Sequence, residues 1–212
     1  MKILIIKLSS LGDIIHTLPL VHQLRQHYPE AQIDWLVGNK GLEILLLINE
    51  LNNVYPLNLK SLQAIQKQNY DYVIDVQGLL KTAILARLTF GKKLIGFKNT
   101  REFADIFYDE KANVGNLFDT KTHIIDLNLK LISNLIKQER SQIPKIKFSI
   151  PKIYNPDNQK LLEIKSKKKK VLAFPSTTWE SKLWPINYWY ELLNIISKDF
   201  HVILCASQND LH

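Results

Sequence analysis

The segment from Met1 to Pro19 constrains the fold more than any other part of this chain. A short apolar run is followed by a turn of small residues with one glycine, Gly12, and then by an amphipathic stretch that opens near Asp13. This order is typical of the first strand, loop and helix of an open parallel α/β sheet, in which ligands bind at the carboxyl ends of the strands. Because the loop lacks the Gly-x-Gly-x-x-Gly pattern of dinucleotide-binding folds, we expect a different ligand.

Apolar runs alternate with amphipathic segments over the rest of the chain. The expected strands are Lys2–Lys7, Gln32–Val37, Asn53–Tyr55, Tyr72–Val76, Lys93–Gly96, Val171–Phe174 and His201–Cys205. The expected helices are Asp13–His27, Leu42–Glu50, Lys60–Lys67, Leu80–Thr89, Thr122–Lys137, Pro156–Lys165 and Pro185–Ser197. Several apolar runs are continuous rather than alternating, as in parallel strands covered on both faces. The pattern therefore predicts an α/β fold built from βαβ units with right-handed crossovers.

A domain boundary is expected within the stretch Glu139–Ser166, which is rich in proline and lysine and has little periodicity. We place an N-terminal Rossmann-like domain at residues 1–150 and the start of a second at 151–212. The second part has only two expected strands and one crossover, which leaves exposed strand edges and little core. We therefore expect the second domain to be incomplete in this chain.

Composition excludes several classes of protein. With 46% hydrophobic and 23% charged residues, the chain is globular rather than disordered. No apolar run approaches the ~20 residues that span a bilayer, and the first residues lack the regions of a signal peptide, so we expect a cytoplasmic protein. The single cysteine, Cys205, excludes an internal disulfide and a thiolate metal cluster, and its apolar neighbours predict a buried thiol.

The formal net charge of +8 fits an anionic partner. That partner could be a phosphate-bearing substrate, an anionic lipid surface or a nucleic acid, and a generally lysine-rich composition is an alternative explanation. The run Lys167–Lys170 directly precedes an apolar strand and has no interleaved aromatic residues. We interpret it as the solvated approach to that strand rather than as a nucleic-acid patch. No histidine pair has metal-ligand spacing, so no zinc site is expected.

The first loop and helix carry the first group of candidate site residues, which are Ser9, Ser10, Gly12, Asp13 and His16. Asp13 has two interpretations, because an aspartate at a helix start can cap the helix or act as a general base. The two interpretations require different pKa values for Asp13. A helix N-terminus lowers the pKa of a carboxylate, whereas a good general base needs a pKa nearer the working pH. His16 lies one turn further on and could orient Asp13, contact an anion or pack.

Two further loops bring cations to the same predicted edge of the sheet. Gln77, Gly78 and Lys81 follow an apolar run and open a helix. A lysine in the first helical turn is unfavourable unless an anion compensates it, which favours a functional role for Lys81. Arg101 follows the next expected strand and a short polar loop. It is suited to bidentate capture of a carboxylate or phosphate, or to a surface salt bridge.

In the second domain, the strand before Pro175 ends in a loop rich in hydroxyl groups. The candidates there are Ser176, Thr177, Thr178 and Lys182, followed by a helix that Pro185 starts. The hydroxyls could bond phosphate oxygens, with Lys182 as the counter-charge. We expect this loop to face the first domain across a cleft.

Taken in order, these motifs resemble those of a known family. The matching text is Lys-Leu-Ser-Ser-Leu-Gly-Asp-Ile-Ile-His-Thr-Leu-Pro, then Tyr-Asp-Tyr-Val-Ile-Asp-Val-Gln-Gly-Leu-Leu-Lys, Asn-Thr-Arg-Glu and Thr-Thr-x-x-x-Lys-x-Trp-Pro. The chain resembles the heptosyltransferases of lipopolysaccharide core assembly over nearly its whole length. The resemblance implies a GT-B type glycosyltransferase with two facing Rossmann-like domains. The first would bind the Kdo–lipid A acceptor and the second ADP-heptose, and transfer would invert the anomeric centre.

The resemblance also implies roles for the matching residues. Asp13 would be the general base for the acceptor hydroxyl, while Lys81 and Arg101 would face the anionic acceptor. The other candidates expected on the acceptor side are Ser9, Ser10, Gly12, His16, Gln77 and Gly78. The residues implied for the donor diphosphate are Thr177, Thr178 and Lys182. Lys182 would offset the charge of the departing ADP, and neither a metal nor a cofactor is implied because ADP-heptose is a co-substrate.

The expected partners are therefore ADP-heptose, Kdo–lipid A and the cytoplasmic face of the inner membrane, with no nucleic acid. The positive charge suits docking to phosphorylated lipid. One alternative stays open, a non-catalytic acceptor- or nucleotide-binding Rossmann module. A nucleotide-dependent oxidoreductase is disfavoured because the glycine motif is absent.

Overall fold

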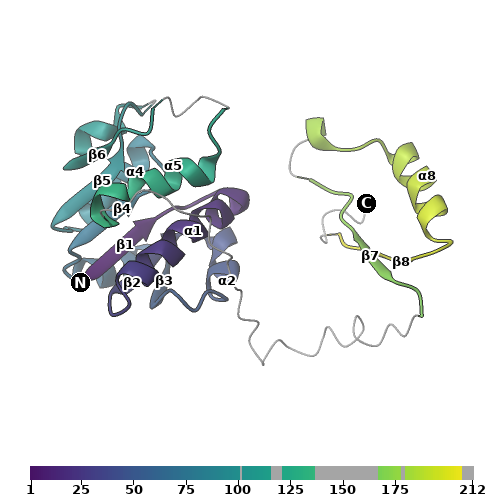
Figure 1. Ribbon diagram of the computed structural model, residues 1–212, viewed down its shortest axis with the longest axis horizontal. Helices are drawn as coiled ribbons and strands as arrows, with labels where there is room; N and C mark the ends of the chain where they lie inside the picture. The colour runs from purple at the N-terminus through teal and green to yellow at the C-terminus, as the bar shows by residue number, and fades with distance from the viewer. Residues whose placement is uncertain (101, 116–120, 137–166, 178–179, 207–212) are drawn as a thin grey trace. The chain divides into compact units, whose positions relative to one another are not determined.

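The computed structural model describes residues 1–100, 102–115, 121–136, 167–177 and 180–206. The chain divides into two compact units, Met1–Lys152 and Ile153–His212, which are described separately below (Figure 1). The predicted α/β class and Rossmann-like parallel sheet are confirmed.

The first unit is built on a six-stranded parallel sheet in the order β3-β2-β1-β4-β5-β6. The strands are β1 (Lys2–Ile6), β2 (Gln32–Val37), β3 (Asn53–Pro56), β4 (Tyr72–Asp75), β5 (Lys93–Phe97) and β6 (Glu110–Ala112). The chain runs outward from β1 to β3 in one direction and then from β4 to β6 in the other. The order therefore reverses between β1 and β4, and the carboxyl ends of these two strands flank the crevice where such sheets bind ligands.

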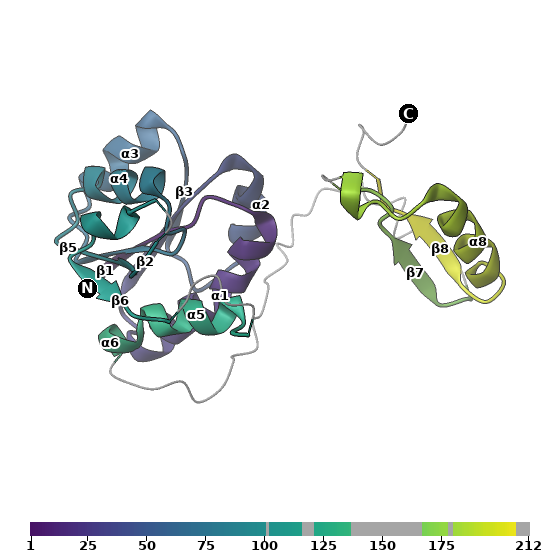
Figure 2. The same ribbon diagram turned by 90° about the horizontal axis from the view of Figure 1, so that it is seen from above.

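Helices cover both faces of this sheet. They are α1 (Leu11–His27), α2 (Leu42–Leu45), α3 (Leu59–Gln66), α4 (Leu80–Leu88), α5 (Ile124–Leu131) and α6 (Ser133–Ile136), with 3-10 turns η1 (Asn39–Gly41) and η2 (Ala104–Phe107). Figure 2 shows α1 and α5 on one side of the sheet and α3 and α4 on the other. Strand β1 contains a continuous apolar run, Ile3–Ile6, because both of its faces are covered.

The central strand β1 divides the core of this unit into two layers. Ile3 and Ile5 pack with the α1 and α5 side of the sheet, whereas Leu4 and Ile6 pack with the α3 and α4 side. All four side chains are fully buried. Since successive residues of a strand point to opposite faces, this strand anchors both layers and fixes the position of the loop that follows it.

The second unit contains a single β–α–β crossover among its described residues. Strand β7 (Lys170–Ala173) pairs in parallel with β8 (His201–Leu204), and they are joined through η4 (Glu180–Lys182) and α8 (Ile186–Ile196). Ala173 is the only buried hydrophobic residue of this unit within the described ranges. The predicted strand–helix–strand pattern is confirmed, with bounds shifted by about one residue.

Several local predictions were wrong. The helix expected over Leu42–Glu50 ends at Leu45, and α1 begins at Leu11 rather than at Asp13. Strand β6 was not predicted, because a three-residue edge strand with one buried side chain has no apolar run to reveal it. Cys205 is half-buried rather than buried. The helix expected over Pro156–Lys165 lies outside the described residues.

Candidate active site

The loop between β1 and α1 places Asp13 at the switch point of the sheet. Ser10 is the N-cap of α1 and Asp13 is its third residue, so the cap is Ser10 and not the aspartate. The Ser10 backbone N–H and its Oγ both donate to Asp13 Oδ2, at 3.0 and 2.9 Å. Both hydrogen bonds run from Ser10 to the carboxylate, and the one from the Ser10 N–H is the contact that the third helical residue makes in a capping box. Together they fix one oxygen of the carboxylate.

The other oxygen of the carboxylate, Oδ1, accepts no hydrogen bond from any residue that the structure describes. Asp13 is half-buried, so this oxygen is not sealed in the core. Burial raises the pKa of Asp13, but the Ser10 N–H, the charge of Lys7, the Ser10 hydroxyl and the charge of His16 together bring it below its usual value. The carboxylate is therefore ionised at neutral pH and has one oxygen free to accept a proton.

Lys7 is a charged residue that sequence reasoning missed. It directly follows β1, and its side chain is only 6% exposed. Its Nζ donates to the Val76 carbonyl oxygen at 3.3 Å, and it interacts electrostatically with Asp13 and Asp75. The available signal was a lysine at the end of a central strand, where an apolar residue is the rule.

The backbone of the β1–α1 loop is held by β2 and the turn after it. Trp35 Nε1 donates to the Lys7 carbonyl oxygen at 3.0 Å, and the Gly38 N–H donates to the Leu8 carbonyl oxygen at 3.0 Å. A Cβ at Gly38 would lie 2.6 Å from that same Leu8 oxygen. The position therefore requires glycine, because a side chain would displace the loop that carries Asp13.

Gln77 links the loop after β4 to the loop after β1. Its Oε1 accepts from the backbone N–H groups of Leu8 and Ser9, at 3.2 and 3.4 Å. The sequence placed Gln77 toward the same edge as Asp13, and the structure brings the two loops together there. Its observed contacts fix the shape of the Asp13 loop.

Asp75, the last residue of β4, holds the backbone of the β4–α4 loop in place through hydrogen bonds. Its Oδ1 accepts from the N–H groups of Gln77 and Gly78, at 2.9 and 3.2 Å, and its Oδ2 accepts from the Tyr108 hydroxyl at 2.8 Å. Burial raises the pKa of Asp75, and these hydrogen bonds oppose that rise. Gly78 adopts a φ of +68°, a backbone conformation that glycine reaches at little cost.

The other acceptor-side candidates are distributed around these two loops. Lys81 is exposed in the first turn of α4, as predicted. Ser9 and Gly12 are exposed as well. Arg101 lies outside the described residues.

His16 is half-buried between α1 and the start of α5. Its ring meets the ring of His123 edge-on, with centroids 5.5 Å apart, and its backbone oxygen accepts from Asn128 Nδ2 at 3.2 Å. The His16 Nδ1 atom is buried without a hydrogen-bond partner within the described part of the chain. Of the three interpretations left open by the sequence, these contacts favour packing.

In the second unit, Thr177 and Lys182 are both exposed after β7, whereas Thr178 lies outside the described residues. Lys182 ends the short turn η4. Trp184 packs edge-on against Trp189 at 5.2 Å and also meets the ring of Tyr188. These aromatic side chains therefore contact one another beside the loop.

The described ranges contain no cluster of three or more histidine, cysteine, aspartate or glutamate side chains arranged to hold a metal ion. Within the same ranges, no helix is both long enough and apolar enough to span a bilayer.

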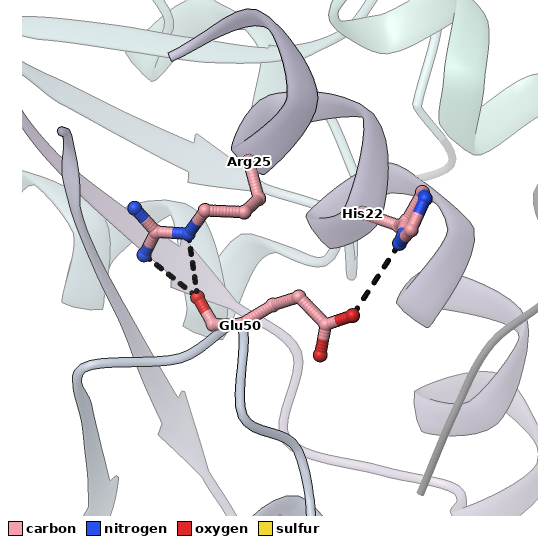
Figure 3. A network of polar contacts seen from close by, with 3 residues as sticks. All are labelled: His22, Arg25 and Glu50. Carbon is pink, nitrogen blue, oxygen red and sulfur yellow. Dashed lines mark hydrogen bonds and ion pairs between the residues drawn. The ribbon is translucent and has the colours of Figure 1, made fainter. Parts of the chain in front are cut away.

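An open polar depression of about 590 Å³ lies at the opposite, amino-terminal edge of the sheet, where Gln32 and Asn53 begin their strands. Arg25 lines it, but its guanidinium group donates to the backbone oxygens of Pro29, Ala31 and Glu50 and to Asn52 Oδ1. Figure 3 shows Arg25 on the Glu50 carbonyl, with His22 meeting the Glu50 carboxylate. Arg25 joins the end of α1 to the loop before β3, and its donors bind oxygens of the protein itself. We therefore interpret its role as structural and do not assign a ligand to this depression.

The sheet reversal with a carboxylate at its switch point, followed by a second β–α–β unit, defines the chain as a Rossmann-like α/β protein. The model of glycosyltransferase family 9 (heptosyltransferase) matches residues 58–211. The chain therefore belongs to that family, as its sequence motifs predicted.

Comparison with individual proteins agrees with this assignment. The chain is 28% identical to lipopolysaccharide heptosyltransferase 1 of Campylobacter coli, over 94% of this chain and 62% of that protein. It is 27% identical to the Escherichia coli K12 enzyme of the same name, over 93% of this chain and 65% of that protein. The chain thus spans less than two thirds of the length of these two relatives.

Solved structures match over almost the whole chain. The structure of E. coli heptosyltransferase WaaC with ADP has a TM-score of 0.75 at 27% identity, covering 98% of this chain and 67% of that one. The complex of WaaC with ADP-2-deoxy-2-fluoro heptose gives the same TM-score at 25% identity, over 99% and 70%. A family 9 glycosyltransferase from Veillonella parvula has a TM-score of 0.82 at 14% identity, over 99% and 63%, which shows the fold alone.

Proposed function

We propose that this protein is an inverting heptosyltransferase that transfers heptose from ADP-heptose to the Kdo residue of Kdo–lipid A during assembly of the lipopolysaccharide inner core. The observation that carries the proposal is the position of Asp13, an ionised carboxylate at the switch point with one oxygen anchored and the other unpaired. Such a group can accept a proton from a sugar hydroxyl.

In the proposed reaction, Asp13 Oδ1 takes the proton of the acceptor hydroxyl as its oxygen attacks C1 of the heptose. The new glycosidic C–O bond forms while the bond between C1 and the diphosphate breaks, and ADP leaves with the bonding electron pair. Anchoring of Oδ2 by Ser10 holds the carboxylate in one orientation, so less of its motion must be frozen in the transition state.

We assign the donor site to Thr177, Thr178 and Lys182 of the second unit. The hydroxyl groups would bond diphosphate oxygens and the lysine would stabilise the negative charge of the leaving ADP. Support comes from the exposure of Thr177 and Lys182 on the loop after β7, the region where α/β folds bind phosphates. The matching WaaC structures contain ADP and an ADP-heptose analogue.

We assign the acceptor side to the residues around the β1–α1 and β4–α4 loops. Lys81 and Arg101 would contact the acidic groups of the acceptor, with Ser9, Gly12, Gly78 and His16 around them. Ser10 and Gln77 would act mainly by fixing Asp13 and its loop, since their observed contacts lie within the protein. The heptosyltransferase I specificity is supported by relatives that carry the name lipopolysaccharide heptosyltransferase 1.

We also propose that the protein works at the cytoplasmic face of the inner membrane, where its lipid acceptor is embedded. Large apolar side chains are exposed on one face of α4 and on the adjoining η2, next to Lys81. This α4–η2 surface comprises Leu80, Ile84, Leu88, Phe103 and Ile106. Exposed apolar groups beside a cation fit an interfacial contact with a lipid surface.

The proposal is tested by incubating the purified protein with radiolabelled ADP-heptose and Kdo–lipid A in detergent micelles. Transfer of label to the lipid, with one ADP released per heptose, is the expected result. Binding of either substrate by calorimetry without transfer would favour the alternative of a non-catalytic binding module. Failure to bind either substrate would contradict both interpretations.

A further inference from the structure

We propose that Lys7 is a positioning residue for the transfer reaction, whose buried ammonium group keeps the Asp13 carboxylate ionised when anionic substrates enter the site. This inference rests on the proposed function of Asp13. It assigns a role to a buried cation that the mechanism above does not use.

Lys7 is placed rigidly, and its charge is shielded from water. The residue follows the buried run Ile3–Ile6 of β1. Its carbonyl oxygen accepts from Trp35 Nε1 at 3.0 Å, and its own N–H donates to the Leu36 carbonyl at 3.3 Å. The side chain is 6% exposed, and Nζ donates to the Val76 carbonyl at 3.3 Å. A charged group is rarely buried to this extent unless nearby opposite charges compensate it.

Two carboxylates on different elements interact electrostatically with this ammonium group, Asp13 on α1 and Asp75 at the end of β4. Burial lowers the pKa of Lys7 below its usual value, and the two carboxylates oppose this fall only in part. Asp75 is fully buried and already accepts hydrogen bonds from Tyr108, Gln77 and Gly78. Asp13 is the half-exposed member of the group, so it is the carboxylate whose charge Lys7 can control during a reaction.

Three residues determine the electrostatic environment of Asp13. The Ser10 N–H and hydroxyl anchor it at the start of α1, His16 lies one turn away, and the charge of Lys7, the residue after β1, also acts on it. Ser10 carries no charge, and the His16 ring is packed against His123. Among the residues the structure describes, Lys7 is therefore the buried lysine whose charge acts on Asp13.

The substrates explain why such a cation is needed. A nucleoside diphosphate-sugar and an acceptor bearing carboxylate and phosphate groups bring negative charge toward Asp13, and like charges favour the protonated acid. Protonated Asp13 cannot act as a base. Exposed lysines would be screened by salt and water, whereas a buried ammonium retains its effect. Lys7 thus keeps Asp13 ionised in the loaded site.

The experiment compares the wild type with Lys7→Met and Lys7→Arg, using kcat per folded molecule between about pH 5 and pH 9. Methionine keeps the length and apolar character of the side chain and removes the charge. We expect kcat of Lys7→Met to fall about tenfold at the acidic end and less than about threefold at the alkaline end, and Lys7→Arg to keep the wild-type profile. The matched control is Lys67→Met, which removes an exposed lysine that follows α3.

A second measurement does not depend on turnover. The carboxyl ¹³C signal of Asp13, assigned by its loss in Asp13→Asn, is titrated in the wild type and in Lys7→Met. The proposal expects the midpoint to move to higher pH in Lys7→Met and to stay in place in Lys67→Met. An unchanged midpoint, or a loss of kcat that is the same at every pH, would overturn the role of Lys7. If the midpoint moves but no variant or wild type transfers heptose, the proposed function fails while the electrostatic coupling stands.

Discussion

At the scale of single residues, the candidate site depends on the fact that only one of the two carboxylate oxygens of Asp13 accepts hydrogen bonds from the described residues. Ser10 holds Oδ2 through two donors, and no described residue holds Oδ1. A general base needs such an arrangement, because a carboxylate saturated with hydrogen bonds would have no oxygen available for the proton of the acceptor.

Replacing Asp13 by asparagine should remove the base and keep the cap of α1, since an amide oxygen can still accept from Ser10. We expect kcat to fall by about 10²–10⁴-fold with little change in melting temperature. The measurement is radiolabel transfer together with thermal melting of Asp13→Asn. Ser10→Ala is the companion variant, and it should lose less activity. Turnover near the wild-type rate in Asp13→Asn would refute the assignment of the base.

The pH dependence of the wild type follows from the same environment. Asp13 must be ionised to act, and the surrounding donors and Lys7 hold its pKa below the usual value. The acidic limb of kcat/KM should therefore lie at lower pH than an ordinary aspartate would give, with the rate flat from about pH 8 down to about pH 5. A rate that already declines between pH 7 and pH 6 would contradict this.

Gly96 leaves the space that the Tyr108 ring needs to donate its hydrogen bond to the buried Asp75. A Cβ at Gly96 would lie 2.1 Å from the Tyr108 ring, so Gly96→Ala must displace that ring and its hydroxyl from Asp75. We expect a loss of about 2–4 kcal/mol in the free energy of unfolding, from overpacking and an unpaired buried carboxylate oxygen. Chemical denaturation measures it. Gly115→Ala is a control without a steric clash, because nothing lies within 4 Å of its Cβ, although its φ of +85° adds some strain.

At the scale of elements, the strands were predictable and the loop contacts were not. Strands β1 and β5 are recognisable because the continuous apolar sequences Ile3–Ile6 and Leu94–Phe97 reflect burial on both faces. The helix expected over Leu42–Glu50 failed because the apolar residues after Leu45 pack as a turn. Lys7 was overlooked because its significance lies in a contact with Val76, which a strand pattern does not contain.

The α4–η2 surface provides the prediction at this scale. Phe103 and Ile106 are 75% and 67% exposed, and Ile84 is 41% exposed. Changing all three to glutamine should reduce co-sedimentation with anionic phospholipid vesicles by at least about tenfold, since each side chain loses an apolar contact with lipid. Transfer to acceptor dispersed in detergent should stay near the wild-type value, because none of the three residues contacts substrate in the proposed mechanism.

The control for vesicle binding is a variant with glutamine at Leu46 and Leu59. These side chains are 63% and 79% exposed and lie outside the α4–η2 surface. This variant should bind vesicles as the wild type does. Equal loss of binding in both variants would show that general surface hydrophobicity, rather than this surface, is responsible.

At the scale of the whole molecule, the charge pairs of the first unit govern its response to acid. Hydrogen bonds from Lys92, Arg87 and Lys93 lower the pKa values of Asp71, Asp109 and Glu110, respectively. A lowered pKa in the folded state means that stability is present above about pH 4, the unfolded value, and is lost as the pH falls through the folded value. Asp75 acts in the opposite sense, because burial raises its pKa.

The melting temperature should therefore fall as the pH is lowered from about 5 to about 3 and the three carboxylates become protonated. Differential scanning fluorimetry across this range measures it. Asp109→Asn should make the dependence shallower, because the Arg87 pair at 2.6 Å no longer titrates. A melting temperature that increases on acidification would show that Asp75 outweighs the three pairs.

The second unit provides the last prediction. If Lys182 stabilises the donor diphosphate, Lys182→Ala should weaken ADP-sugar binding by about tenfold and leave acceptor binding almost unchanged. Calorimetry with each substrate separately tests this. Lys168→Ala is a control, since Lys168 is exposed but donates to the backbone after α8 instead. Equal weakening of both substrates by Lys182→Ala would count against a donor-side role.

The sequence by itself determined the α/β class, the strands other than β6, and the loops that carry Asp13 and Lys81, because apolar periodicity and turn residues are local properties of the chain. Only the tertiary structure revealed that Gln77 holds the Asp13 loop and that Tyr108, packed against Gly96, completes the Asp75 network. It also revealed that Lys7 is buried and interacts electrostatically with two carboxylates. These relations join residues distant in the sequence. Their strength depends on burial and on distances that arise only when the sheet is assembled.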